Sequence, residues 1–431
     1  MDLRRLGFLA VLLVYMIGPN PKVGGAQIGD AVLLAFAVAF IASTRFRTPA
    51  SLVTFFAWPA AVVMASTLGK TFSGIPVGSD EINNVLKMVS LGLLGLIGAA
   101  LGRADEERDG PSLAGQMCWL VVVGVLFTGT LGLLEFSRPS LFRSLVGGLY
   151  EKELVIRLTN VELAEQAGRI AAVFSWANAF GMFLLLALTV LVLNWREVGR
   201  VALVASLGIG IPCLILTNSR IALLLFGFVS VYAAVVQRRW ALVFLLGFGA
   251  CGVLLLVPVE SLVGSRNAVR LGELVEFVRS GQLPANLEVR LGVLTFLPRL
   301  IANSEYLAFG FPMSVYHTTV AVSPDNQYLG FFVKYGLMAV LLFVWQAWAI
   351  VLPAGRLRAQ DLTPRRRVQL HTLVLLNVAV ALGGLSQDTL FAERWREFYF
   401  AFSGVILGAV LAPPRSEGPP SPVDVTAAAQ L

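Results

Sequence analysis

Long apolar runs alternate with short polar connections along almost the whole chain. A helix needs about 17 to 25 mostly apolar residues to cross a hydrocarbon core of about 30 Å, and about twelve runs meet or approach this length. The pattern therefore predicts an all-α, polytopic membrane protein with about twelve transmembrane helices. The expected helices are centred on residues 6–17, 28–42, 50–68, 85–101, 115–134, 171–193, 201–216, 221–236, 240–257, 328–352, 370–385 and 398–411.

Two connections, residues 135–168 and 258–324, are much longer than the others. In the second, apolar residues recur at helical spacing in two stretches, which predicts two short amphipathic helices lying on the membrane face. The C-terminal residues 412–431 are rich in Pro, Ser, Glu and Ala, a composition that predicts disorder. We therefore expect one integral-membrane domain over residues 1–411, with a large helical loop at 258–324, followed by a disordered tail.

The basic residues of the short connections predict the orientation in the membrane. If the N-terminus with Arg4 and Arg5 is cytoplasmic, the arginines of the alternate short loops fall on the same side. Both termini and the tail are then cytoplasmic, and both long loops lie across the membrane. The first apolar run lacks a small-residue cleavage site and is followed by many others, so we expect a retained helix and not a signal peptide.

Composition agrees with a membrane protein, because 57% of the residues are hydrophobic, 14% are charged and the mean hydropathy is +0.78. The net charge of +7 is not arranged as a basic stripe interleaved with aromatic residues, so we expect anionic lipids or lipid-linked substrates as partners and no nucleic acid. All three cysteines fall inside apolar runs, and the two histidines are far apart. The sequence therefore predicts neither a disulfide framework nor a metal site, and no Gly-rich nucleotide loop is present.

Two polar constellations precede predicted helices on the non-cytoplasmic side. Arg169 and Asn178 are nine residues apart, about two and a half helical turns, which predicts related faces of one helix. The plainer interpretation is an interfacial arginine and a helix-packing amide. In Thr217-Asn218-Ser219-Arg220, a short hairpin presents an arginine and helix N-terminal amides, both of which attract phosphate. The plainer interpretation is a turn whose arginine reaches lipid headgroups.

A third constellation, Arg290 and Arg299, lies in the second predicted loop helix, where a solvated face is the alternative. The fourth is Asp325-Asn326-Gln327-Tyr328 at the start of an apolar run that also contains Lys334. The plainer interpretation of these polar residues is that Asn326 caps the helix and that Asp325 interacts favourably with the helix dipole. This interpretation does not explain Lys334, because a charge within a membrane segment is costly unless it pairs, reaches the interface or lines a wet cavity.

Several cations and one carboxylate on one side of a membrane suit glycosyl transfer from a lipid pyrophosphate. Departing pyrophosphate develops negative charge that fixed arginines stabilise. The attacking sugar hydroxyl needs a general base, for which Asp325 is the first candidate and His317 the second.

In order and spacing, these motifs resemble the O-antigen polymerase and O-antigen ligase superfamily of bacterial membrane glycosyltransferases, over residues 169–352. Arg169, Phe174 and Asn178 look like the motif before the family's middle helix. The Thr217 to Arg220 hairpin is similar to its Ser-Arg hairpin. Residues 290–310 resemble the end of its periplasmic loop, and residues 325–329 with Gly336 look like the motif that closes that loop.

The resemblance implies a GT-C-like fold in the bacterial inner membrane and a periplasmic transfer, without metal or cofactor, from undecaprenyl-pyrophosphate-linked glycan to an acceptor glycan. By position, Arg220 and Arg290 would hold pyrophosphate, with Arg169 a further candidate. A chain-length regulator protein is an implied partner. The remaining substrate-binding candidates are Asn178, Ser219, Arg299, Asn326, Tyr328 and Lys334.

One departure favours one branch of the family. The ligase branch has a histidine directly before the asparagine, whereas Asp325 stands there in this chain and His317 is eight residues upstream. We therefore expect a polymerase of O-antigen, capsule or exopolysaccharide, with a ligase that transfers glycan to lipid A-core as the alternative. A transporter is a further alternative, although no paired broken helices appear in two halves of the chain. A lipid-linked oligosaccharide flippase would share the substrate but tolerate Asp325→Asn.

Overall fold

The computed structural model describes residues 2–18, 22–23, 26–43, 48–105, 112–146, 150, 170–174, 177–237, 297–312, 327–358, 362–385 and 394–411. The predicted run 240–257, most of the loop 258–324 and the tail 412–431 lie outside these residues.

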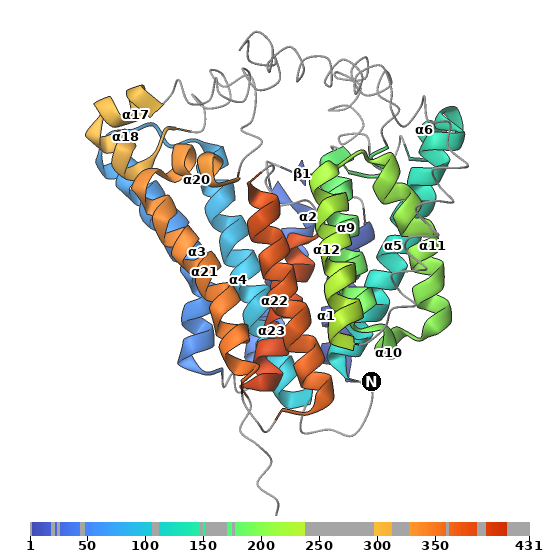
Figure 1. Ribbon diagram of the computed structural model, residues 1–431. Helices are drawn as coiled ribbons and strands as arrows, with labels where there is room; N and C mark the ends of the chain where they lie inside the picture. The colour runs from blue at the N-terminus through green and yellow to red at the C-terminus, as the bar shows by residue number, and fades with distance from the viewer. Residues whose placement is uncertain are drawn as a thin grey trace, which may run out of the picture.

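Helices account for nearly all the regular structure in these ranges, with one short antiparallel pair of strands in which Lys22 lies opposite Gln27. Figure 1 shows the long helices running side by side between a lower end, where the N-terminus lies, and an upper end with α6, α17 and α18. The elements are α1 (Leu3–Ile17), β1 (Lys22–Val23), β2 (Ala26–Gln27), α2 (Ile28–Ser43), α3 (Ala50–Phe72), α4 (Ser79–Asp105), α5 (Leu113–Ser137), α6 (Pro139–Val146), α9 (Ala177–Leu193), α10 (Trp195–Val198), α11 (Arg200–Leu216), α12 (Arg220–Gln237), α17 (Leu297–Ala302), α18 (Ser304–Phe309), α20 (Gln327–Tyr335), η2 (Gly336–Met338), α21 (Ala339–Arg356), α22 (Pro364–Gly384) and α23 (Arg396–Val410).

Each predicted apolar run that falls within the described ranges is helical over most of its length. Among the described residues, five helices are long and apolar enough to cross a membrane, by length and composition: α3, α4, α5, α22 and the continuous stretch Gln327–Arg356. Shorter apolar helices, including α9 and α11, stand among them. The structure thus supports a helical membrane protein.

Two predicted helices differ from the observed ones in a way that matters for the site. Helix α9 begins at Ala177, and residues 170–174 before it are turns, with Ala172 at a φ of +47°. The helix predicted over residues 171–193 therefore begins later than expected, and Arg169, the partner expected for Asn178, lies outside the described residues. The predicted run 328–352 is divided at Gly336, whose φ is +59°, so that Lys334 lies in the last turn of α20 and not inside one long helix.

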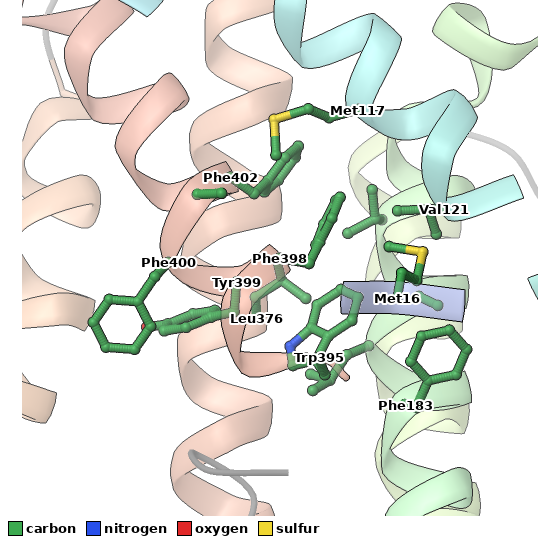
Figure 2. Packing of buried hydrophobic residues seen from close by; sticks show 14 of the residues in the cluster. Met16, Met117, Val121, Phe183, Leu376, Trp395, Phe398, Tyr399, Phe400 and Phe402 are labelled. Carbon is green, nitrogen blue, oxygen red and sulfur yellow. The ribbon is translucent and has the colours of Figure 1, made fainter. Parts of the chain in front are cut away.

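Helix α23 is the centre of the bundle, because every residue from Arg396 to Ala409 is buried. Its aromatic side chains pack among residues of α1, α5, α9 and α22, as Figure 2 shows. Against α4 it packs through glycines: a Cβ at Gly404 or Gly408 would lie 2.1 Å from a carbonyl oxygen of α4. Small residues at such positions let two membrane helices approach closely.

The outward face of the bundle is apolar. On α12, a stripe at helical spacing is exposed, whereas the opposite face, including Ala222 and Phe226, is buried. Such a stripe is typical of contact with lipid, since soluble proteins rarely expose contiguous apolar surface of this kind. The stripe consists of Leu224, Phe228, Val231 and Val235.

Candidate functional site

The polar constellations predicted from the sequence fall at the upper end wherever the structure describes them (Figure 1). Arg220 is the first residue of α12, and Arg299 lies in α17. Asn178, Ser219, Tyr328 and Lys334 are also within the described ranges. The remaining predicted site residues, Arg169, Arg290, His317, Asp325 and Asn326, lie outside them.

The first two constellations lie side by side although about forty residues separate them. The backbone N–H of Ile170 donates to the Leu216 carbonyl at 3.3 Å. Gly181, one turn beyond Asn178 on α9, touches the hairpin, because a Cβ there would lie 2.7 Å from Ser219 Cβ and 2.9 Å from Thr217 Oγ1. Absence of a side chain at Gly181 is therefore what allows α9 to approach the hairpin.

The hairpin itself is a tight turn that ends in a helix cap. Thr217 Oγ1 donates to the Leu214 carbonyl at 2.7 Å, and Asn218 has a φ of +51°. The Ser219 carbonyl accepts the N–H of Leu223 at 3.0 Å, so Ser219 immediately precedes the first turn of α12. A serine in this position normally accepts an N–H of that turn with its side chain. Here Ser219 Oγ is buried and has no hydrogen-bond partner in the described part of the chain.

Residues 170–174 are held from two sides. Glu135, at the end of α5, accepts the backbone N–H groups of Ala171 at 2.9 Å and Ala172 at 2.6 Å with the same carboxylate oxygen. On the other side, the guanidinium of Arg394 lies 5.7 Å from the ring centroid of Phe174 and 5.1 Å from that of Tyr150. The segment that precedes Asn178 is thus fixed by a carboxylate and by a cation between two aromatic rings.

Residues 394–397 are a charged cluster that the sequence interpretation missed. Arg394 Nη1 donates to the Gly18 carbonyl at 2.8 Å, which ties the entry of α23 to the end of α1. Arg396 Nε donates to Glu397 Oε1 at 2.7 Å, and both side chains are buried. The second oxygen, Glu397 Oε2, is buried without a partner among the described residues. The sequence signal was the run of charges directly before the last apolar run, because charges beside a membrane segment, like Lys334, are costly unless they are paired.

Tyr328 and its neighbours fix the start of α20 against α22. Tyr328 Oη donates to the Ala381 carbonyl at 2.7 Å, and its ring packs edge-on against Phe343 at 5.3 Å. Gln327 is buried and its Nε2 lies 3.4 Å from Gln346 Oε1. Helix α22 also contacts α9 and α12, so one helix borders both the hairpin side and the α20 side. The hydroxyl of Tyr328 therefore makes a structural contact between α20 and α22.

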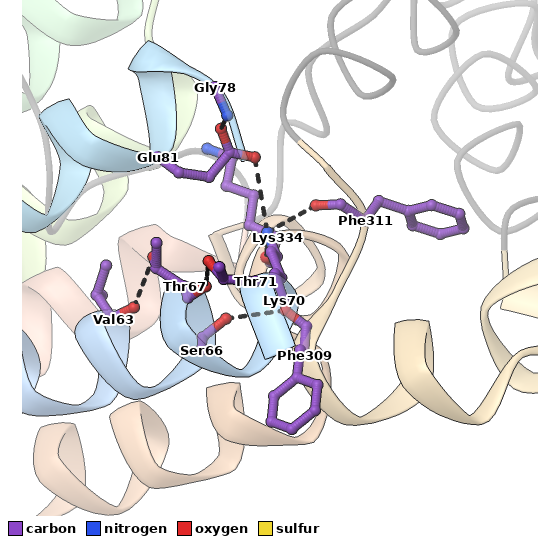
Figure 3. Close-up of polar contacts among 10 residues, drawn as sticks. All are labelled: Val63, Ser66, Thr67, Lys70, Thr71, Gly78, Glu81, Phe309, Phe311 and Lys334. Atoms are coloured by element: carbon purple, nitrogen blue, oxygen red, sulfur yellow. Dashed lines mark hydrogen bonds and ion pairs between the residues drawn. The ribbon is translucent and has the colours of Figure 1, made fainter. Parts of the chain in front are cut away.

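Lys70, near the end of α3, is a second feature that the sequence interpretation missed (Figure 3). Its ammonium is buried and donates to the carbonyls of Phe311 at 2.8 Å and Lys334 at 2.9 Å. Glu81 Oε1 of α4 lies 3.9 Å away. Lys334 therefore contributes its backbone carbonyl to this contact. The sequence pattern predicted a buried cation at Lys334, and in the structure Lys70 is the buried cation.

The segment 307–311 and the break between α20 and η2 cross each other at Lys70. The N–H of Phe311 donates to the Val333 carbonyl at 2.9 Å, and Ser66 Oγ donates to the Phe309 carbonyl at 2.8 Å. Gly310 and Gly336 both have positive φ, and a Cβ on Gly310 would lie 2.3 Å from the Lys334 carbonyl oxygen. We name these contacts the loop clamp: Lys70, Glu81, Ser66 and residues 307–311 and 333–336.

Comparisons with protein-family models and with curated proteins find no match to the chain.

Proposed function

We propose that the protein polymerises undecaprenyl-pyrophosphate-linked oligosaccharide repeat units, such as those of O-antigen, capsule or exopolysaccharide, at the periplasmic face of the bacterial inner membrane. The observation that carries the proposal is the buried Ser219 Oγ with no described partner at the N-terminus of α12. The next residue is Arg220, and the first N–H groups of a helix lack intrahelical partners. We expect the Ser219 hydroxyl and these amides to bind a pyrophosphate, with the arginine that the sequence places next to them.

The arrangement around this position favours a binding site over a plain turn. Gly181 and residues 170–174 hold the hairpin from one side, and Glu135 and Arg394 fix those residues in turn. Groups held in this way need little reorganisation when charge develops in a transition state. The resemblance of residues 169–352 to the O-antigen polymerase and ligase superfamily, of which the same hairpin is one motif, supports this assignment.

In the proposed reaction, an acceptor sugar hydroxyl attacks the anomeric carbon of the donor glycan. The bond between that carbon and the pyrophosphate oxygen breaks, and undecaprenyl pyrophosphate leaves. Asp325 takes the proton of the attacking hydroxyl, with His317 as the alternative base. Arg220, Arg290 and the first-turn amides of α12 stabilise the negative charge on the leaving pyrophosphate. Donor and acceptor are both lipid-linked, so the product stays in the membrane.

The test is incubation of the purified protein with a lipid-linked repeat unit, with and without a lipid A-core acceptor, and separation of products by mass. A ladder of lipid-linked multimers without the core acceptor is the expected result. Sugar found only on the core would replace the polymerase with a ligase and direct attention to His317. Absence of transfer to either acceptor would remove the enzymatic proposal and favour transport.

The variant Asp325→Asn separates catalysis from transport of the same substrate. It keeps the size of the side chain and removes its basicity, so multimers should disappear while binding of the lipid-linked substrate remains. A flippase would tolerate the change. Normal multimer formation by Asp325→Asn would exclude Asp325 as the base.

A further inference from the structure

A cavity of about 640 Å³ lies at the lower end of the bundle, across the molecule from the hairpin and the loop clamp. Its walls come from the end of α9, from α10, from the end of α12 and from the first two turns of α22. It shares no residue with the upper-end site. The proposed polymerase site therefore does not account for this cavity.

The polar wall of the cavity is basic. Three arginines and one glutamate line it, a formal charge of +2 with His371 neutral. Arg365 is neutralised, because its Nε and Nη2 each lie 2.7 Å from an oxygen of Glu197. Arg196 and Arg367 make no ion pair within the described ranges, and Arg196 lies 5.5 Å above the ring centroid of Trp195. Two exposed arginines thus line the cavity with no carboxylate partner among the described residues, an arrangement that suits an anion.

The N-terminal turn of α22 adds to this wall. Thr363 caps the helix by accepting the N–H of Arg366 at 3.3 Å, and Thr363, Pro364 and Arg365 all line the cavity. The positive end of a helix dipole therefore lies at the cavity together with the arginines. Deeper in the wall, His371 Nδ1 shares a hydrogen bond of 2.7 Å with Tyr232, which fixes the imidazole between α22 and α12.

The other wall is apolar and reaches the outer surface. Leu193, Val236 and Val368 line the cavity, and Val236 is itself 45% exposed. It directly follows Val235, the last residue of the outward apolar stripe of α12. An occupant thus finds cationic groups on one side and a path to the lipid-facing surface on the other.

We propose that this lower-end cavity binds the phosphate group of an anionic membrane lipid, with Arg196 and Arg367 on the phosphate and Val236 beside the acyl chain. A soluble phosphorylated compound offers the same phosphate chemistry and is the other source to be tested. Two charge-assisted contacts are available to the phosphate. Phosphatidylcholine carries the same phosphate but also a choline ammonium, which the two arginines repel, so the site should prefer a lipid with a net negative charge.

The experiment is native mass spectrometry of the detergent-purified protein with an equimolar mixture of phosphatidylglycerol and phosphatidylcholine. The unmodified protein should retain phosphatidylglycerol in preference. The double variant Arg196→Ala/Arg367→Ala should lose about tenfold of that preference, the equivalent of about 1.4 kcal/mol. The matched control is Arg356→Ala/Arg358→Ala, which removes two exposed arginines at the same end, outside the cavity, and should keep the preference.

A second variant, Val236→Trp, keeps every charge and fills the cavity, so it should also lose the retained lipid. Melting temperatures of all variants check that they remain folded. Repetition with excess inorganic phosphate separates the sources: retained lipid identifies the headgroup as the ligand, and displaced lipid identifies a site that takes soluble phosphates as well. Equal preference for phosphatidylglycerol in the unmodified protein, the cavity variants and the control would overturn the proposal.

Discussion

At the scale of single residues, Ser219 is unusual because burial and an unused hydrogen-bonding group coincide. A buried hydroxyl without a partner lowers the free energy of unfolding by about 1–3 kcal/mol, so alanine at this position would make the protein more stable. Ser219→Ala should therefore leave the melting temperature unchanged or slightly raised. If the hydroxyl binds substrate, multimer formation should fall about tenfold, the equivalent of one hydrogen bond to a charged group.

The control for this prediction is Ser230→Ala, in the helix α12 that Ser219 precedes. Ser230 is also buried, but its Oγ donates to the Phe226 carbonyl at 2.7 Å, one turn before it. Ser230→Ala should therefore leave multimer formation unchanged. A Ser219→Ala protein that melts earlier and polymerises normally would assign the hydroxyl a structural role and contradict the binding role.

Gly181 tests whether the approach of α9 to the hairpin matters. In Gly181→Ala the new methyl group would lie within 3 Å of Ser219 and Thr217, so the hairpin must move. Overpacking of this kind costs about 1–3 kcal/mol, and a displaced Ser219 should reduce multimer formation as well. The same substitution at Gly227 of α12 meets nothing within 4 Å. Gly227→Ala should be neutral or stabilising, since alanine is the better helix former, and equal melting temperatures for both variants would contradict the packing argument.

At the scale of elements, the loop clamp connects the segment that ends the large loop to the bundle. Lys70 holds two carbonyls from different segments, and Gly310 and Gly336 let those segments cross. Breaking a buried ion pair by removing one partner costs about 3–5 kcal/mol where the contact is intact. The Lys70–Glu81 separation of 3.9 Å is long, so most of the effect should come from the two lost carbonyl contacts.

Lys70→Met should therefore release residues 307–311 while the bundle stays folded. Hydrogen exchange should accelerate at the Phe311 N–H, which bonds the Val333 carbonyl, and not in α23. Lys334→Met is the matched control, because the structure uses the carbonyl of Lys334 to accept from Lys70. The loop clamp would be misidentified if exchange at the Phe311 N–H became faster in the Lys334 variant. It would also be misidentified if exchange there did not become faster in the Lys70 variant.

The sequence could predict the helices but not their interruptions. Apolar runs of membrane length predict α3, α4, α5 and α22 to within about six residues of their observed ends, because unpaired backbone groups in lipid are costly and a helix pairs them. The breaks before Ala177 and at Gly336 depend on contacts with Glu135 and with the segment 307–311, which no local pattern contains. Local propensity alone would continue a helix through both.

For the candidate site, sequence reasoning found the motifs and missed what supports them. The pattern at Ser219 and Arg220 is local, so it could be read directly. Lys70 lies 241 residues from the carbonyl of Phe311 that it holds, and Arg394 lies 376 residues from Gly18. Such pairings can be seen only in the fold. Lys70, two residues beyond the apolar run predicted at 50–68, was nevertheless a signal, because a charge in a membrane helix is costly unless it has a partner.

At the scale of the whole molecule, the two ends differ in chemistry. The lower end has ion pairs that close the helix ends, such as Arg5 with Asp105 at 2.7 Å, and exposed arginines at Arg356 and Arg358. The upper end has the hairpin with Ser219, the charged cluster at residues 394–397 and the loop clamp. An excess of arginine in short connections favours the lower end as cytoplasmic, which would place the hairpin on the opposite side of the membrane, where the proposed reaction takes place.

This orientation can be tested by cysteine accessibility in a background from which Cys118, Cys213 and Cys251 have been removed. Ser304 of α18 is exposed at the upper end, and Arg356 is exposed at the lower end. An impermeant maleimide should label Ser304→Cys in intact spheroplasts, and Arg356→Cys only after the membrane is permeabilised. The reverse pattern would put Ser219 and Arg220 in the cytoplasm. Polymerisation at the periplasmic face would then be impossible at this hairpin, however well its groups suit a pyrophosphate.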